Sequence, residues 1–129
     1  MPEVHVERMR VALHETDASG RIHFSSVFRW AEVAEHGLFR AHGTPVEASF
    51  PRATVSATYR RPLEFGQELD LEIWVTRLGT SSVGLAWRAV AGGETAVEGE
   101  HVAVHVGEAG TPAPLDPELR AHLSRYLHA

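Results

Sequence analysis

Neither cysteine nor lysine occurs in this chain of 129 residues. Without cysteine, a disulfide scaffold and thiol redox chemistry are excluded. Without lysine, Schiff-base catalysis is excluded, and arginine is the only long cationic side chain. The formal net charge is -5, and the basic residues form no cluster beyond the pair Arg60-Arg61. Nucleic acid is therefore not an expected partner.

Long apolar runs are also missing. No segment has the length of a membrane span or of a signal peptide, and several charged residues stand among the first ten. We therefore expect no membrane span and a cytoplasmic location. The length fits a single domain, residues 1–129, which is large enough to bury a core without a metal or a disulfide.

Apolar residues alternate with polar ones in several segments, which predicts β-strands. In residues 4–13 the alternation changes phase, which predicts one strand with a bulge or a bend. His101 and His105 share one face of the last strand, but no third ligand stands at metal-binding spacing, so no zinc site is expected. The strands after the first are predicted at 54–61, 69–75, 82–90 and 96–106.

Between the first two strands, residues 25–42 have the periodicity of a long helix. Its apolar residues spread around much of the helical wheel and leave no wide polar face, so we expect other elements to cover it. Ser25 or Ser26 is predicted to cap its first amides, and Gly43 with Pro45 to end it. A second, short amphipathic helix is predicted at 116–127.

Asp17 and Gly20, just ahead of the long helix, give the strongest chemical signal. Gly20 can adopt a positive φ, so the chain can reverse there and bring the Asp17 carboxylate close to the helix start. Free amides at a helix start favour a developing oxyanion, and a carboxylate beside them can act as a nucleophile or as a base for water. Because Asp and Gly are also common in ordinary turns, the motif depends on its context.

That context is a resemblance carried by two segments. Residues 15–32, ETDASGRIHFSSVFRWAE, resemble the signature of the 4-hydroxybenzoyl-CoA thioesterase family of hotdog-fold proteins. Residues 59–69, YRRPLEFGQEL, are similar to the family's segment of Tyr, Pro, Gly and an acidic residue between two strands, and Ser82 fits the start of a later strand. The matching positions in the first segment are Asp17, Gly20, Phe24, Arg29, Trp30 and Glu32.

The resemblance implies an α+β hotdog fold, in which an antiparallel sheet wraps around a long central helix. It also implies an acyl-CoA thioesterase with Asp17 as catalytic carboxylate and the backbone amide of His23 or Phe24 as oxyanion donor. Gly20, Val27 and Ser82 are then expected to bind the substrate. Coenzyme A is then part of the substrate, an acyl-CoA or acyl-carrier thioester, and no cofactor is expected. Hotdog proteins are similar in pairing their sheets, so we expect a homodimer or homotetramer with the active site at the interface.

Several positions depart from the family pattern. Arg21 stands in place of an aliphatic residue, His23 in place of a tyrosine, and Val27 and Ala31 in place of aromatic residues. In the family these positions line or flank the acyl tunnel, so the acyl group is the open question. The small Val27 and Ala31 either leave room for a larger acyl group or compensate for large neighbours in the core.

Other side chains have two interpretations each. His23 either donates to the thioester or orients the catalytic carboxylate, or it is an ordinary turn residue. Arg60 and Arg61 either bind the phosphates of coenzyme A or form a solvated strand end. Glu32 and Glu35 are either a carboxylate pair on the helix or solvated or interface residues, and the second interpretation is favoured because a carboxylate is already supplied by the loop.

Two other functions compete with thioester hydrolysis. A hotdog dehydratase or hydratase would share the fold, but the proline of its expected His-Phe-Pro motif is missing from His23-Phe24-Ser25. A non-catalytic acyl-CoA-binding sensor would keep the pocket and lose the carboxylate, and the presence of Asp17 argues against it.

Overall fold

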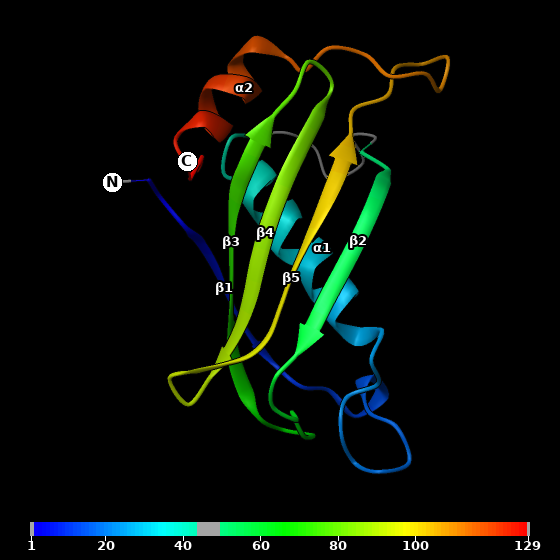
Figure 1. The fold of residues 1–129 in the computed structure, drawn as a ribbon, viewed down its shortest axis with the longest axis vertical. Helices are drawn as coiled ribbons and strands as arrows, with labels where there is room; N and C mark the ends of the chain where they lie inside the picture. The colour runs from blue at the N-terminus through cyan, green and yellow to red at the C-terminus, as the bar shows by residue number, and fades with distance from the viewer. Residues whose placement is uncertain (1, 44–49, 129) are drawn as a thin grey trace.

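A five-stranded antiparallel sheet curves around one long helix (Figure 1). The computed structural model describes residues 2–43 and 50–128, and the strand order is β1-β3-β4-β5-β2. The predicted α+β architecture, a sheet wrapped around a central helix, is confirmed. The elements are β1 (His5–Arg10), α1 (Ser26–Arg40), β2 (Arg52–Tyr59), β3 (Glu68–Leu78), β4 (Ser82–Ala91), β5 (Glu94–Val104) and α2 (Pro117–Ser124).

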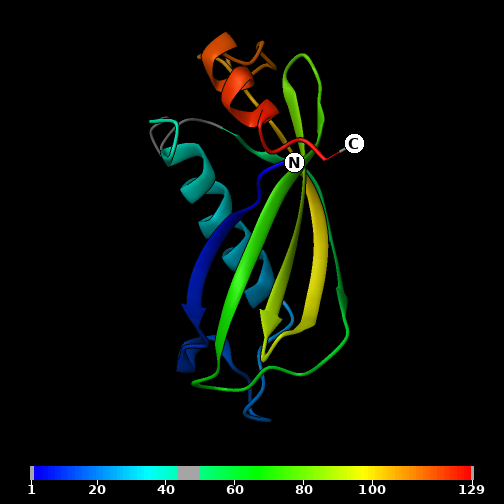
Figure 2. The same cartoon turned by 90° about the vertical axis from the view of Figure 1, so that its left-hand side faces the viewer.

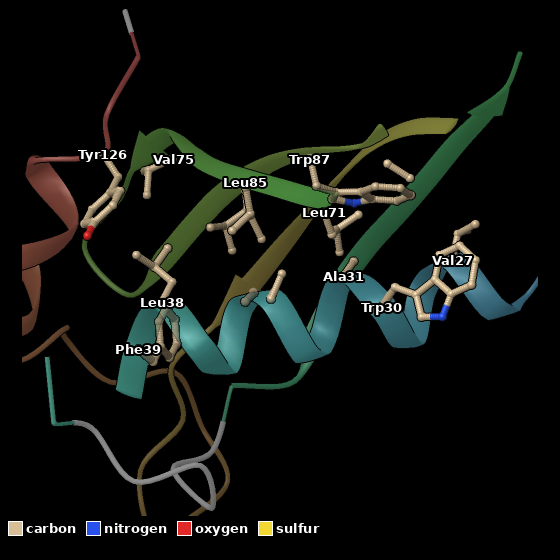
Figure 3. Close-up of a cluster of buried hydrophobic side chains, with 14 of the residues drawn as sticks. Val27, Trp30, Ala31, Leu38, Phe39, Leu71, Val75, Leu85, Trp87 and Tyr126 are labelled. Atoms are coloured by element: carbon tan, nitrogen blue, oxygen red, sulfur yellow. The ribbon is translucent and has the colours of Figure 1, made fainter. Parts of the chain in front are cut away.

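The hydrophobic core lies between α1 and the inner face of the sheet (Figure 2). Alternation places every second side chain of β3 and β4 on this face, where they are buried. Figure 3 shows Leu71, Leu85 and Trp87 of the sheet pointing toward Ala31 and Leu38 of α1. Every second residue of the strands and the residues on one face of the helix therefore contribute their side chains to one core.

Glu35 is the exception on the buried side of α1. Its side chain is 2 % exposed, and its Oε1 lies 2.7 Å from Nε2 of His101, which is equally buried on β5. Its Oε2 lies 3.5 Å from Nη1 of Arg52 at the start of β2. The expectation that Glu35 is solvated or at an interface is therefore wrong, because a buried carboxylate is tolerated where cationic and hydrogen-bonding partners surround it.

The opposite side of α1 is not covered within the protomer. Arg29, Glu32, Val33 and Arg40 are exposed along it. The prediction that the helix has no wide polar face is wrong for the single chain, because the apolar residues concentrate on the side that packs on the sheet.

The first strand is shorter than predicted, and it contains no bulge. It ends at Arg10, and a short 3-10 helix, Leu13–Glu15, follows. The amide of Ala12 donates to Oε1 of Glu15, and the hydroxyl of Thr16 donates to the carbonyl of Leu13. These local bonds replace pairing with β3, so the change of phase marks the end of the strand.

The remaining elements agree with their predicted positions to within a few residues. The last strand ends at Val104, and Val106 forms only an isolated bridge with Pro112. Asp116 caps α2 by accepting the amide of Leu119, and the predicted stop at Pro45 lies outside the described residues. Among the described helices, none is both long and apolar enough to cross a membrane.

Candidate active site

The Asp17 loop makes the tight turn that the sequence predicts. Gly20 has a φ of 83°, and its amide donates to the carbonyl of Asp17. The amide of Asp17 in turn donates to the carbonyl of Arg21. A left-handed conformation at Gly20 closes the loop, which is the role that its lack of a Cβ permits.

The Asp17 carboxylate is exposed, and among the described residues only one of its two oxygens accepts hydrogen bonds. Its Oδ1 accepts the amide of Ser19 at 2.8 Å and the hydroxyl of Ser19 at 2.5 Å. In the described part of the chain, no hydrogen bond uses Oδ2. The side-chain and backbone hydrogen bonds from Ser19 hold the pKa of Asp17 below its usual 3.8. The carboxylate is therefore ionised at neutral pH, with one oxygen free to react.

At the start of α1, only one of the two predicted oxyanion donors is available. The amide of His23 donates to the carbonyl of Glu15 at 2.8 Å, so the prediction that it serves as an oxyanion donor is corrected. The amide of Phe24 has no acceptor within residues 2–43 and 50–128. Neither Ser25 nor Ser26 caps the helix amides, because their hydroxyls bond to His23 and to the Glu15 carbonyl instead.

Hydrogen bonds of Glu15 connect the Asp17 loop to α1. The sequence did not predict this role. Its Oε2 accepts Nε1 of the buried Trp30 at 2.7 Å, and its Oε1 accepts the Ala12 amide at 2.8 Å. Its main-chain carbonyl accepts the His23 amide and the Ser26 hydroxyl. A buried tryptophan needs a hydrogen-bond acceptor for its indole N–H, and this is the only sequence signal for the role of Glu15. The hydrophobic periodicity does not identify which residue is that acceptor.

A pocket of about 480 Å³ opens beside Asp17. It brings the loop, the helix start and the end of β2 together, and the Tyr59 hydroxyl donates to the carbonyl of Phe24 across it. Burial raises the pKa of Tyr59, so the hydroxyl stays protonated as this bond requires. The pocket is lined by Asp17, Arg21, Ile22, His23, Phe24, Tyr59, Arg60, Arg61, Pro62 and Leu63.

Three arginines line the pocket. Arg60 and Arg61 lie there as predicted, and each is paired with a carboxylate of β5, Glu98 and Glu94 respectively. The hydrogen bond from Arg60 lowers the pKa of Glu98. Arg21 forms no ion pair within 4.0 Å among the described residues.

Two predicted substrate-binding residues do not reach this pocket in the protomer. Val27 is fully buried in the core. Ser82 pairs with Val104, whereas Tyr59 at the pocket pairs with Val97, seven residues away along β5. At about 3.3 Å per residue, Ser82 lies roughly 20 Å along the sheet from the pocket.

The two histidines predicted on the last strand, and the cluster of three metal-ligating groups found among the described residues, do not line the pocket. His101 is paired with Glu35, and the ring of His105 bonds to the carbonyl of Ala113, so the two histidines do not converge. Elsewhere, His42, Asp116 and Glu118 place ligand atoms within 4.8 Å of one another. Asp116 already caps α2 there, and the expectation of a metal-free protein stays a prediction.

The chain belongs to the thioesterase superfamily, whose family model matches residues 19–98. A solved thioesterase from Thermus thermophilus, complexed with coenzyme A and Zn, is 27% identical. The match covers 92% of this chain and 90% of that one, with a TM-score of 0.85. The hotdog fold that the sequence predicts is therefore confirmed, and the resemblance to thioesterases is confirmed with it.

Two curated relatives are each named 1,4-dihydroxy-2-naphthoyl-CoA hydrolase. The protein from Prochlorococcus marinus strain NATL1A is 26% identical over 98 residues, and the match covers 65% of this chain and 65% of that protein. The protein from strain MIT 9303 is 32% identical over 89 residues, and the match covers 58% of this chain and 59% of that protein. The chain thus spans somewhat less than two thirds of the relatives it matches.

We expect Gly20→Val to reduce kcat by about 100-fold, because a branched residue resists a positive φ and a shift of about 1 Å misplaces Asp17 relative to the Phe24 amide. A Cβ at Gly20 meets no atom within 4 Å, so the strain is conformational only. Gly110 has a φ of 75° and equally open surroundings in a distant loop, so Gly110→Val is the matched control. Equal kcat for the two variants in a thiol-release assay would contradict the prediction.

We expect Glu15→Gln to destabilise the protein by about 1–3 kcal/mol, because glutamine offers one acceptor where Ala12 and Trp30 both donate. In a Trp30→Phe background the second acceptor is no longer needed, so the same change should cost less. Urea unfolding of all four proteins measures the difference. An identical cost in both backgrounds would show that Glu15 does not anchor the indole.

Proposed function

We propose that the protein hydrolyses acyl-CoA thioesters in the pocket beside Asp17. The observation that carries the proposal is the placement of a carboxylate with a free oxygen next to an unengaged amide at the start of a helix. A thiolate leaves without needing an acid, so one carboxylate and a preorganised donor are sufficient for this reaction. The relatives named as CoA thioester hydrolases support the same chemistry.

In one route, Asp17 accepts a proton from water while the water oxygen bonds to the thioester carbon. The carbonyl oxygen becomes an oxyanion that accepts the Phe24 amide, and its collapse breaks the C–S bond and releases the thiolate of coenzyme A. In the other route, Oδ2 of Asp17 bonds to the carbon and expels the thiolate, and water then splits the resulting anhydride. After a single turnover in water labelled with heavy oxygen, label in Asp17 identifies the second route, with water attacking Cγ of Asp17 in the anhydride.

Aromatic acyl groups are the substrates that the pocket and the relatives favour. Phe24 is 64% exposed and Tyr59 is 45% exposed, and both line the pocket, where their rings can pack against a flat acyl group. The two curated relatives are named for a naphthoyl thioester. Arg60 and Arg61 at the rim are placed to meet the phosphates of coenzyme A.

We further propose that β2 pairs with β2 of a second copy. The outer edge of β1 carries Arg8 and Arg10, which discourage strand pairing, whereas residues 53–59 of β2 carry no charge. Val55 on β2 is also 47% exposed. Because Tyr59 of the same strand lines the pocket, a second copy on this edge would lie beside the active site.

Asp17→Asn should lower kcat by roughly 100-fold or more, since it removes the reacting charge. Asparagine keeps an oxygen for the two bonds from Ser19, so the loop and the melting temperature should be preserved. The matched control is Asp70→Asn, which removes a half-buried carboxylate of β3 that is paired with Arg8 and does not line the pocket. Release of free thiol from aromatic, short-chain and long-chain acyl-CoAs is measured.

Near-normal turnover by Asp17→Asn would contradict the assignment of the carboxylate. Wild-type protein that binds acyl-CoA but releases no thiol from any member of the panel would identify a sensor. Hydration of an enoyl-CoA without thiol release would identify a hydratase.

Val55→Glu should convert the protein from a dimer to a monomer at micromolar concentration, because it places two like charges on the proposed strand pair. Val6→Glu is the matched control, since Val6 is 49% exposed on the opposite edge strand. Sedimentation velocity measures the masses. A stable wild-type monomer with full activity would overturn the proposed pairing.

A further inference from the structure

The ring of His23 is fixed in one tautomer by its contacts with Ser25. Its Nδ1 lies 3.2 Å from the backbone amide of Ser25 and 2.7 Å from the Ser25 hydroxyl. A backbone amide can only donate, so Nδ1 of the neutral ring must accept. The proton of the neutral ring therefore lies on Nε2.

Nε2 is on the opposite edge of the ring from these contacts. No hydrogen bond within the described ranges uses it, although the ring lines the same pocket as Asp17. The ring packs on Phe24, with centroids 4.5 Å apart, so its place next to the Phe24 residue is fixed. The result is a side-chain N–H donor presented beside the amide that the proposed reaction already uses.

His23 and Asp17 are close without touching. Both residues line the same pocket, yet no hydrogen bond or ion pair joins their side chains within residues 2–43 and 50–128. A direct bond would have occupied both groups. Both groups are therefore open to a ligand bound in the pocket.

We propose that the Nε2–H of His23 is a second oxyanion donor, which hydrogen-bonds the thioester carbonyl oxygen together with the Phe24 amide. The proton stays on Nε2 throughout, and the bond strengthens as negative charge grows on the oxygen. This inference rests on the proposed hydrolysis. It assigns to the side chain of residue 23 a role that its backbone amide, bound to Glu15, does not fill.

Two substitutions separate the two edges of the ring. His23→Asn places an oxygen where Nδ1 accepts the Ser25 amide, so it keeps the loop and deletes the donor. His23→Gln places an N–H near Nε2 and deletes the acceptor. With benzoyl-CoA as substrate, we expect His23→Asn to lose about 100-fold in kcat with little change in KM, and His23→Gln to retain much more activity.

Binding of two unreactive ligands gives a readout that does not need turnover. S-phenacyl-coenzyme A has a ketone, and S-phenethyl-coenzyme A has the same ring without the carbonyl. Wild-type protein and His23→Gln should prefer the ketone. In His23→Asn this preference should be about fivefold weaker, the value of one hydrogen bond, because only the Phe24 amide still donates. Nitrogen NMR of the wild-type imidazole should show Nδ1 without a proton.

The outcomes are distinct from those of the proposed function. If wild-type protein releases no thiol, hydrolysis fails, and the ligand pair still tests the donor. If wild-type protein is active and His23→Asn keeps its kcat and its preference for the ketone, His23 is not a donor and only this inference fails. An equal loss in both variants at unchanged melting temperature would also overturn it, because the ring would then act through the loop structure.

Discussion

The position of the proposed active site depends on the hydrogen bonds of Glu15. Its carboxylate is bound by the buried indole of Trp30 and by the amide of Ala12, and its carbonyl is bound by His23 and Ser26. These contacts join the segment before Asp17, the segment after it and the first turn of α1. A catalytic carboxylate needs positioning to within about 1 Å, and Asp17 itself is fully exposed. The hydrogen bonds of Glu15, two residues before Asp17, therefore hold the loop in place where the surroundings of Asp17 do not.

The openness of the pocket and the uncharged edge of β2 have one common explanation. Electrostatic stabilisation of an oxyanion is strongest where water is excluded, yet Asp17 and Phe24 are exposed in the single chain. The strand that carries Tyr59 into the pocket is also the edge without repelling charges. A second copy on that edge would both satisfy the strand and reduce the exposure of the site, which is why the two proposals support each other.

The sequence predicted what depends on periodicity and on local turn chemistry. Alternation placed the strands, the 3.6-residue period placed α1, and the glycine at position 20 has the positive φ that was expected. It did not predict contacts between distant residues. The burial of Glu35 depends on His101, 66 positions away, and the loss of the His23 amide depends on a carbonyl across the loop. For the same reason the sequence did not predict that Ser25 and Ser26 leave the helix amides uncapped. Their hydroxyls bond to the His23 ring and to the Glu15 carbonyl instead.

The low pKa of Asp17 bears on the choice between its two possible roles. A general base is most effective when its pKa lies near the working pH, and the bonds from Ser19 move Asp17 away from that range. A nucleophile must also be ionised, and Oδ2 is the oxygen that Ser19 leaves free. Thiolate departure needs no acid, so the first step of the proposed anhydride route needs only this oxygen. The bonds from Ser19 thus lower the basicity of the carboxylate in either proposed role, while they keep it ionised with Oδ2 open to the thioester.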